Sequence, residues 1–119
     1  MTHSDEVVLR TLPRTIVLEL HGNVDRSVTD ELTASYERGS ADAEAVRVVL
    51  DFTDADYINS SGIALVVSIL ARARAEGRGV AAIGLTEHYR HIFDITRLSD
   101  FIEVCADLET ALESPGARS

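Results

Sequence analysis

Short runs with the apolar pattern of strands alternate with segments that have the pattern of amphipathic helices along most of this chain. Five short apolar runs predict strands: 7–12, 15–20, 46–52, 80–84 and 101–104. Four segments predict helices: 27–39, 63–75, 89–98 and 107–112. After the first two strands, strands and helices alternate, an order that requires long crossover connections between parallel strands. The sequence therefore predicts an α/β domain with a largely parallel sheet flanked by helices.

Local signals set the expected boundaries of these elements. Pro13 and Arg14 predict a turn between the first two strands. Residues 27–30 have the pattern of a capping box at the start of the first helix. Gly77 is expected to close the second helix, and Asp107 is the expected N-cap of the last one.

The length of the chain suits one domain. We expect its 119 residues to form a single domain, with residues 1–5 and 114–119 frayed. The longest strongly apolar stretch, residues 63–71, is about half of the roughly 18–20 residues that cross a bilayer, so direct membrane insertion is not expected. The first residues do not resemble a secretory signal, which favours the cytoplasm. The single cysteine, Cys105, stands in an apolar run and is expected to be buried and inert.

The charge balance bears on the class of partner. Eleven basic residues, all of them arginine, stand against twenty acidic ones, which gives a formal charge of −9. An acidic field repels nucleic acid and anionic lipid, and no basic cluster with interleaved aromatic residues offsets it. The composition therefore disfavours nucleic acid as a partner and favours protein.

Polar residues gather at two places where a strand ends and a helix begins, residues 21–27 and 54–62. Functional groups of open α/β sheets collect at such places. Asn59 or Ser60 is the expected N-cap of the next helix, a structural role worth about 1 kcal/mol. The positive end of a helix dipole also accommodates an added phosphate, so a serine there is suited to a phosphorylation switch. The residues alone leave both interpretations open.

The helix that follows these serines is apolar on all sides. One face is expected to fill the core: Ile63, Val66, Val67 and Leu70. The opposite face is apolar as well: Ala64, Leu65, Ile69 and Ala71. A helix of this kind is either fully buried or partly an interface.

Residues 48–65 resemble the core signature of the STAS domain family, which is named for sulphate transporters and anti-sigma-factor antagonists. Residues 21–25, His-Gly-Asn-Val-Asp, resemble its Gly-x-x-Asp loop. Residues 73–77 and 80–84 resemble the helix end and the strand that follow, so the resemblance covers nearly the whole chain. It implies a STAS-like fold, with a mixed, mostly parallel five-stranded sheet flanked by about four helices.

The resemblance also implies a function as an anti-sigma factor antagonist. Such a protein binds an anti-sigma factor with serine kinase activity and is released when a serine at the helix start is phosphorylated. Ser60 matches this phosphoacceptor, Ser61 is the alternative, and Asp25 matches a loop aspartate near the site. The implied partner contacts are Asp25, Asn59, Ser61, Gly62, Ile63, Leu65 and Val66. No cofactor, metal or enzymatic activity is implied, ATP would be bound by the partner, and a homodimer is possible.

Asn59 departs from this pattern, because phosphorylated members usually carry Asp before the acceptor serine. The amide keeps the capping geometry and loses the charge. It favours an alternative, a constitutive STAS subunit that binds the ATPase of a lipid transporter without phosphorylation. Two other classes fit less well. A serine hydrolase would need a glycine two residues before its serine, and His88 and His91 resemble surface residues more than metal ligands.

Overall fold

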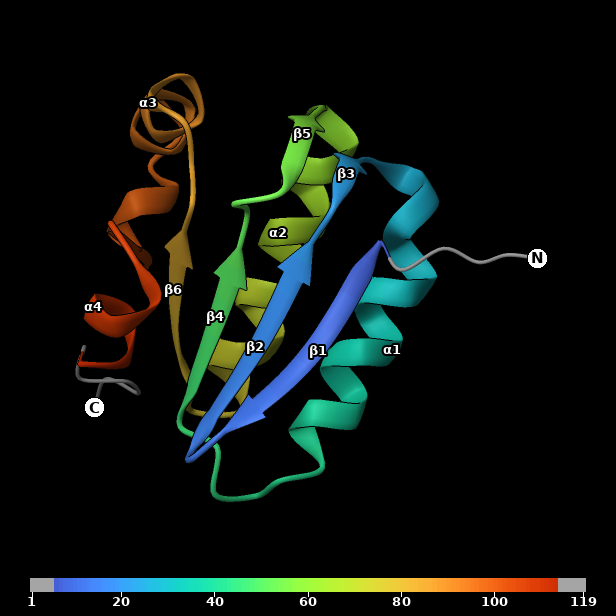
Figure 1. Ribbon diagram of the computed structural model, residues 1–119, viewed down its shortest axis with the longest axis vertical. Coiled ribbons are helices and arrows are strands. Elements are labelled where there is room, and N and C mark those ends of the chain that lie inside the picture. The colour runs from blue at the N-terminus through green and yellow to red at the C-terminus, as the bar shows by residue number, and fades with distance from the viewer. Residues whose placement is uncertain (1–5, 114–119) are drawn as a thin grey trace.

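The strands form one larger and one smaller sheet. The computed structural model describes residues 6–113, so the segments expected to fray lie outside the described residues. The larger sheet has the order β1-β2-β4-β6-β7, and β3 and β5 form a separate two-stranded sheet (Figure 1). Their bounds are β1 Val7–Leu12, β2 Thr15–Leu20, β3 Gly22–Val24, β4 Arg47–Asp51, β5 Ala55–Ile58, β6 Gly79–Ile83 and β7 Ile102–Cys105.

The larger sheet is mixed and mostly parallel, which confirms the expected fold class. The first two strands pair antiparallel across a turn in which Arg14 has a positive φ of 60°. The pairs β2–β4, β4–β6 and β6–β7 are all parallel. The carboxyl ends of β2, β4 and β6 therefore lie at the same end of the molecule, the upper end in Figure 1.

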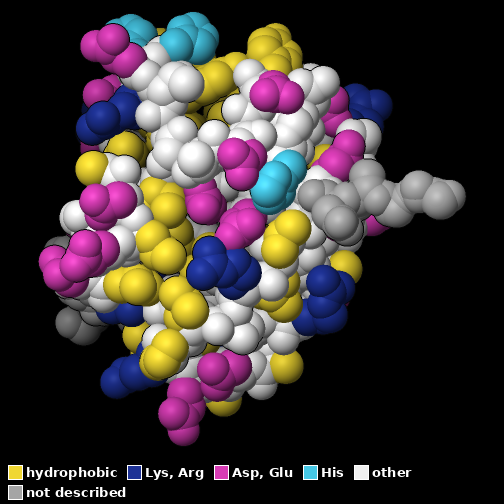
Figure 2. Space-filling view, in the orientation of Figure 1, with side chains coloured by type: hydrophobic (Ala, Val, Ile, Leu, Met, Phe, Trp, Pro, Cys, Tyr) yellow, Lys and Arg dark blue, Asp and Glu magenta, His cyan; other side chains and the backbone are white. Residues whose placement is uncertain are grey.

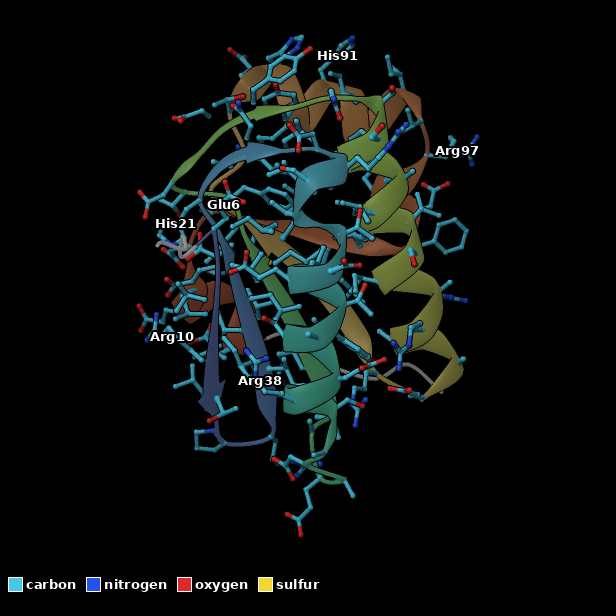
Figure 3. All side chains as sticks on the ribbon, turned by 90° about the vertical axis from the view of Figure 1, so that its right-hand side faces the viewer. Glu6, Arg10, His21, Arg38, His91 and Arg97 are labelled. Carbon is cyan, nitrogen blue, oxygen red and sulfur yellow. The ribbon has the colours of Figure 1, made fainter. Side chains whose placement is uncertain are left out.

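The described residues contain four α-helices, in agreement with the prediction; three of them connect strands and the fourth follows the last strand. They are α1 Thr29–Ser40, α2 Ser60–Ala75, α3 Glu87–Ile95 and α4 Leu108–Leu112, with short 3-10 turns η1 Arg26–Val28 and η2 Leu98–Asp100. Figure 3 shows α1 and α2 beside each other on one side of the sheet. The small α4 packs on the other side, against β6 and β7. None of the helices in residues 6–113 has the length and apolarity that a membrane span needs.

Strand alternation divides the core into two clusters of unequal size. Leu18 and Leu50 belong to the larger cluster, which α1 and α2 cover. Their neighbours Val17 and Val49 point to the other face and belong to the smaller cluster under α4. Cys105 is 7 % exposed in that smaller cluster, which confirms the expected burial, and burial raises the pKa of its thiol.

The start of α1 differs from the expected capping box. Asp25 provides the cap instead of Ser27, because its carboxylate accepts a hydrogen bond from the Ser27 N–H at 2.9 Å and another from the Ser27 hydroxyl. This bond opens the 3-10 turn η1, and α1 then begins at Thr29 without a side-chain cap. Ser27 therefore donates hydrogen bonds here, whereas the capping box required it to accept one.

Candidate functional site

The structure brings together the two polar segments that the sequence singled out. β3 follows β2 and β5 follows β4, and these two short strands pair in parallel beyond the end of the larger sheet. Asn23 lies opposite Tyr57, and Val24 lies opposite Ile58. The loop that carries Asp25 is thereby held beside the start of α2. The site is built by this pairing, at the end of the sheet where the strands run out.

Asn59 caps α2 and fixes the position of Ser60. The Asn59 side-chain oxygen accepts a hydrogen bond from the N–H of Gly62 at 2.9 Å, and the Asn59 carbonyl accepts one from Ile63 at 2.9 Å. The Asn59 N–H donates to the carbonyl of Val24 at 3.3 Å, which ties the cap to β3. Ser60 is the first residue of α2, and its side chain is exposed.

Gly62 lets the start of α2 approach β3 closely. A Cβ at this position would lie 2.1 Å from the carbonyl oxygen of Val24, much closer than atoms can approach. The residue is buried, so its role is close packing. The expected partner contact at Gly62 is corrected for this reason.

Asp25 faces a shallow, open depression beside the serines. The depression has a volume of about 380 Å³ and is lined by Asp25, Arg26, Ser27, Asn59 and Ser61. Hydrogen bonds from the Ser27 hydroxyl and then from the Ser27 N–H lower the pKa of Asp25, so its carboxylate carries a negative charge at neutral pH. The half-buried Ser61 lines this depression, and the exposed Ser60 lies next to it in sequence.

The rotation of α2 differs from the expectation at Val67 and Ile69. Val66 is 1 % exposed and lies in the main core, as its place on the expected core face predicted, so it is not available to a partner and the contact that the resemblance implied for it is corrected. Val67, expected in the core, is 44 % exposed, and Ile69, expected outside, is buried. Ile63 and Leu65 also pack partly against the core.

Two aromatic residues near the site were missed by the sequence analysis. Tyr57 on β5 is 56 % exposed. Its position next to the buried Ile58 in a strand is a signal that could have indicated its outward direction. Tyr89 on α3 accepts a hydrogen bond from Ile58, a contact between distant segments for which the sequence contains no local signal.

Other charged groups do not form a second site in the described residues. Residues 6–113 contain no group of three or more His, Cys, Asp or Glu side chains placed to hold a metal ion. His91 projects from the end of the molecule (Figure 3). Figure 2 shows basic side chains as separate spots among acidic ones on the face seen there.

Comparisons with known proteins agree with this architecture. A family model described as the Mlab STAS domain matches residues 7–105. The structure is similar to that of the Bacillus cell fate determinant SpoIIAA in its phosphorylated form, with a TM-score of 0.69, 18 % identity, and coverage of 90 % of this chain and 96 % of that one.

Two further solved structures have the same fold. A putative anti-sigma factor antagonist from Thermotoga maritima gives a TM-score of 0.78 at 14 % identity, covering 92 % of this chain and 93 % of that one. An anti-sigma factor antagonist from Mycobacterium paratuberculosis gives 0.75 at 17 % identity, covering 89 % of each chain. Since the family model spans the whole sheet and the helix α2, the chain belongs to the STAS domain family.

Proposed function

We propose that this protein is an anti-sigma factor antagonist that binds an anti-sigma factor with serine kinase activity and is released by phosphorylation of Ser60. The observation that carries the proposal is the exposed side chain of Ser60 at the first position of α2, beside the depression that Asp25 lines. The similarity to SpoIIAA, an anti-sigma factor antagonist that has been solved in a phosphorylated form, supports it. In this proposal ATP is bound by the partner, this chain has no catalytic role, and both proteins are cytoplasmic.

The surface around Ser60 suits a contact that a phosphate would break. Exposed Tyr57 and Val67 and half-buried Ile63 and Leu65 place apolar side chains near polar Asp25, Asn59 and Ser61. A phosphoserine adds about −1.5 to −2 charges and would have to lose its hydration inside such an interface. Asp25 already holds a negative charge there and the chain carries −9 in total, so the added charge increases a negative excess that Arg26, the one basic residue in the lining of the depression, offsets in part.

The fold itself tolerates the phosphate. A negative charge at the first turn of a helix is stabilised by the helix dipole and by free backbone N–H groups. Ser60 occupies that first turn and is exposed, whereas Ser61 is half-buried. Ser60 is therefore the proposed acceptor, with Ser61 as the alternative.

A pull-down from the source cells tests the proposal. Wild type and Ser60→Ala should both retain an ATP-binding kinase, and Ser60→Asp should retain at least about tenfold less, because the carboxylate imitates part of the phosphate charge. Thr11→Asp is the matched control, since Thr11 is exposed on β1 at the end of the sheet opposite the site. The captured kinase should then transfer phosphate to Ser60 of wild type, which mass spectrometry of the peptide would locate.

A second candidate function is a constitutive STAS subunit of a lipid transporter or another complex. Two observations favour it: the family model that matches is described as the Mlab STAS domain, and Asn59 replaces the usual Asp before the serine. In that case wild type, Ser60→Ala and Ser60→Asp should all retain the same transporter ATPase in equal amounts. Equal retention would reject the phosphorylation switch and assign Ser60 to the helix start alone.

A further inference from the structure

Tyr89 connects α3 to the segment that carries Ser60. The Tyr89 hydroxyl accepts a hydrogen bond from the backbone N–H of Ile58 at 3.0 Å. Ile58 is the last residue of β5, directly before the cap Asn59 and two residues before Ser60. A side chain from a helix that lies 31 positions later in the sequence therefore holds the approach to the phosphoacceptor.

This hydrogen bond takes the place of a neighbouring strand. In the described part of the chain β5 pairs with β3 alone, and the Asn59 N–H donates to that side, to Val24. Successive N–H groups of an extended segment point to opposite sides, so the N–H of Ile58 points away from β3. Ile58 is buried, and a buried N–H without a partner is costly. The Tyr89 hydroxyl satisfies this group.

Tyr89 is itself held in place by its surroundings. Its side chain is half-buried against the main core, and its ring contacts that of His88 at 4.9 Å between centroids. The Tyr89 N–H donates to the Thr86 hydroxyl that caps α3. Further along α3, the buried ring of Phe93 packs edge-on against Phe52 at 6.1 Å, directly after β4. The hydroxyl is thus placed by a helix that is anchored in the core.

We propose that Tyr89 is a positioning residue for the phosphoacceptor: by holding Ile58, it fixes where the Asn59 cap presents the Ser60 hydroxyl relative to Asp25. The role of Ser60 as acceptor is taken from the proposed function. Asn59 is held on one side by Val24 of β3, and the preceding residue is held on the other side by Tyr89. Loss of the second attachment leaves the start of α2 attached on one side. The Ser60 hydroxyl then samples more orientations, and a kinase that requires one particular orientation phosphorylates it more slowly.

Amide hydrogen exchange in Tyr89→Phe tests directly whether Tyr89 holds Ile58 and the start of α2 in place. Removing the hydroxyl should speed exchange of the Ile58 N–H by about fivefold or more and shift the amide resonances of Ser60 and Ser61. Tyr57→Phe is the matched control: it removes a tyrosine hydroxyl from β5 itself, and no hydrogen bond within residues 6–113 depends on that hydroxyl. Unchanged exchange at Ile58, or equal effects of the two variants, would overturn the proposal.

Phosphate transfer by the kinase captured in the pull-down separates positioning from loss of stability. Thr96→Ala removes the hydroxyl that donates to the Ile92 and Phe93 carbonyls at the far end of α3, which weakens the same helix and leaves the contacts of Tyr89 in place. Tyr89→Phe should lower kcat/KM for Ser60 by about fivefold or more, and Thr96→Ala should leave it near the wild-type value. Equal losses in both variants would reduce Tyr89 to a structural residue.

The two proposals fail in different ways. If wild type is not phosphorylated at all, the proposed function is wrong. The hydrogen-exchange rate of the Ile58 amide and the amide resonance of Ser60 then still decide whether Tyr89 positions this segment. If wild type is phosphorylated and Tyr89→Phe is phosphorylated equally well, the function stands and the positioning role of Tyr89 is rejected.

Discussion

Asn59 shows how one side chain can serve both stability and presentation of the site. Its oxygen takes one of the N–H groups that a helix start leaves free, and its own N–H reaches β3. A carboxylate at this position could make the same bond and would add a favourable charge at the helix start. The amide therefore preserves the geometry of the site and changes its electrostatics.

Substitutions at Asn59 should separate these two contributions. Asn59→Ala should lower the free energy of unfolding by about 1 kcal/mol, because it removes the cap of α2. Asn59→Asp should keep or raise it by about 0.3–1 kcal/mol at low salt through the helix dipole. Urea denaturation measures both, with Ser61→Ala as a control that leaves the cap intact. A loss in Asn59→Asp as large as in Asn59→Ala would contradict the capping role.

At the scale of the element, α2 combines an unambiguous helix with an ambiguous rotation. Its inner face contains Gly62, Val66, Ile69, Leu70 and Ala73, and Val67 faces outward. Since the helix is apolar on all sides, its sequence has no polar face from which the inward side could be read. The close approach of Gly62 to the Val24 carbonyl, a contact between distant segments, fixes the rotation.

Val66 and Val67 give a direct test of this rotation, because they are adjacent and chemically identical. Val66→Ala should lower the free energy of unfolding by about 2 kcal/mol through lost apolar burial and a cavity. Val67→Ala should change it by less than about 0.5 kcal/mol, since Val67 is largely exposed. Similar losses in both variants, measured by urea denaturation, would show that the helix is rotated differently.

The difference between local patterns and contacts of distant segments also explains which other features could be predicted from the sequence. Alternation of strands and helices depends on local periodicity, so the order of the elements along the chain, the largely parallel sheet and the four helices were predicted from it. The strands β3 and β5 were not predicted, and their pairing brings residues 21–27 beside residues 54–62. The cap of η1 by Asp25 and the bond from Ile58 to Tyr89 depend on exact backbone positions, which local patterns do not contain.

At the scale of the whole molecule, a buried arginine secures the end opposite the candidate site. Arg78, 7 % exposed, donates to the Ala45 carbonyl at 2.9 Å and to the Tyr36 hydroxyl at 3.1 Å, and pairs with Glu76. The Tyr36 hydroxyl in turn donates to Glu76 at 2.6 Å. These contacts join α1, the loop before β4 and the turn before β6 at the amino ends of the parallel strands.

Glu76 should make the stability of the fold depend on acid pH. The hydrogen bond from Tyr36, followed by that from Ser40 and the charge of Arg78, lowers the pKa of Glu76 from 4.5 despite the opposing effect of burial. A lowered pKa means that the unfolded chain binds the proton more readily, so the contribution is complete well above pH 4.5 and is lost as the pH falls through the folded-state value. Glu76→Gln should therefore flatten the fall in unfolding free energy below about pH 4.5.

Urea denaturation between pH 3 and pH 7, roughly the range in which carboxylates titrate, measures the slope of the unfolding free energy against pH. Glu44→Gln, in the exposed loop after α1, is the control and should keep the slope of wild type. A slope in Glu76→Gln equal to that of wild type would show that other carboxylates carry the acid sensitivity.

The smaller core cluster has a consequence for how the molecule opens. It is covered by α4, a helix of five residues, so detaching that helix should require less free energy than unfolding the whole sheet. Cys105 lies in this cluster and is the single thiol of the chain. A thiol reagent added to the native protein would modify Cys105 during such openings, so its rate of modification reports local opening of the face under α4 while the face covered by α1 and α2 remains folded.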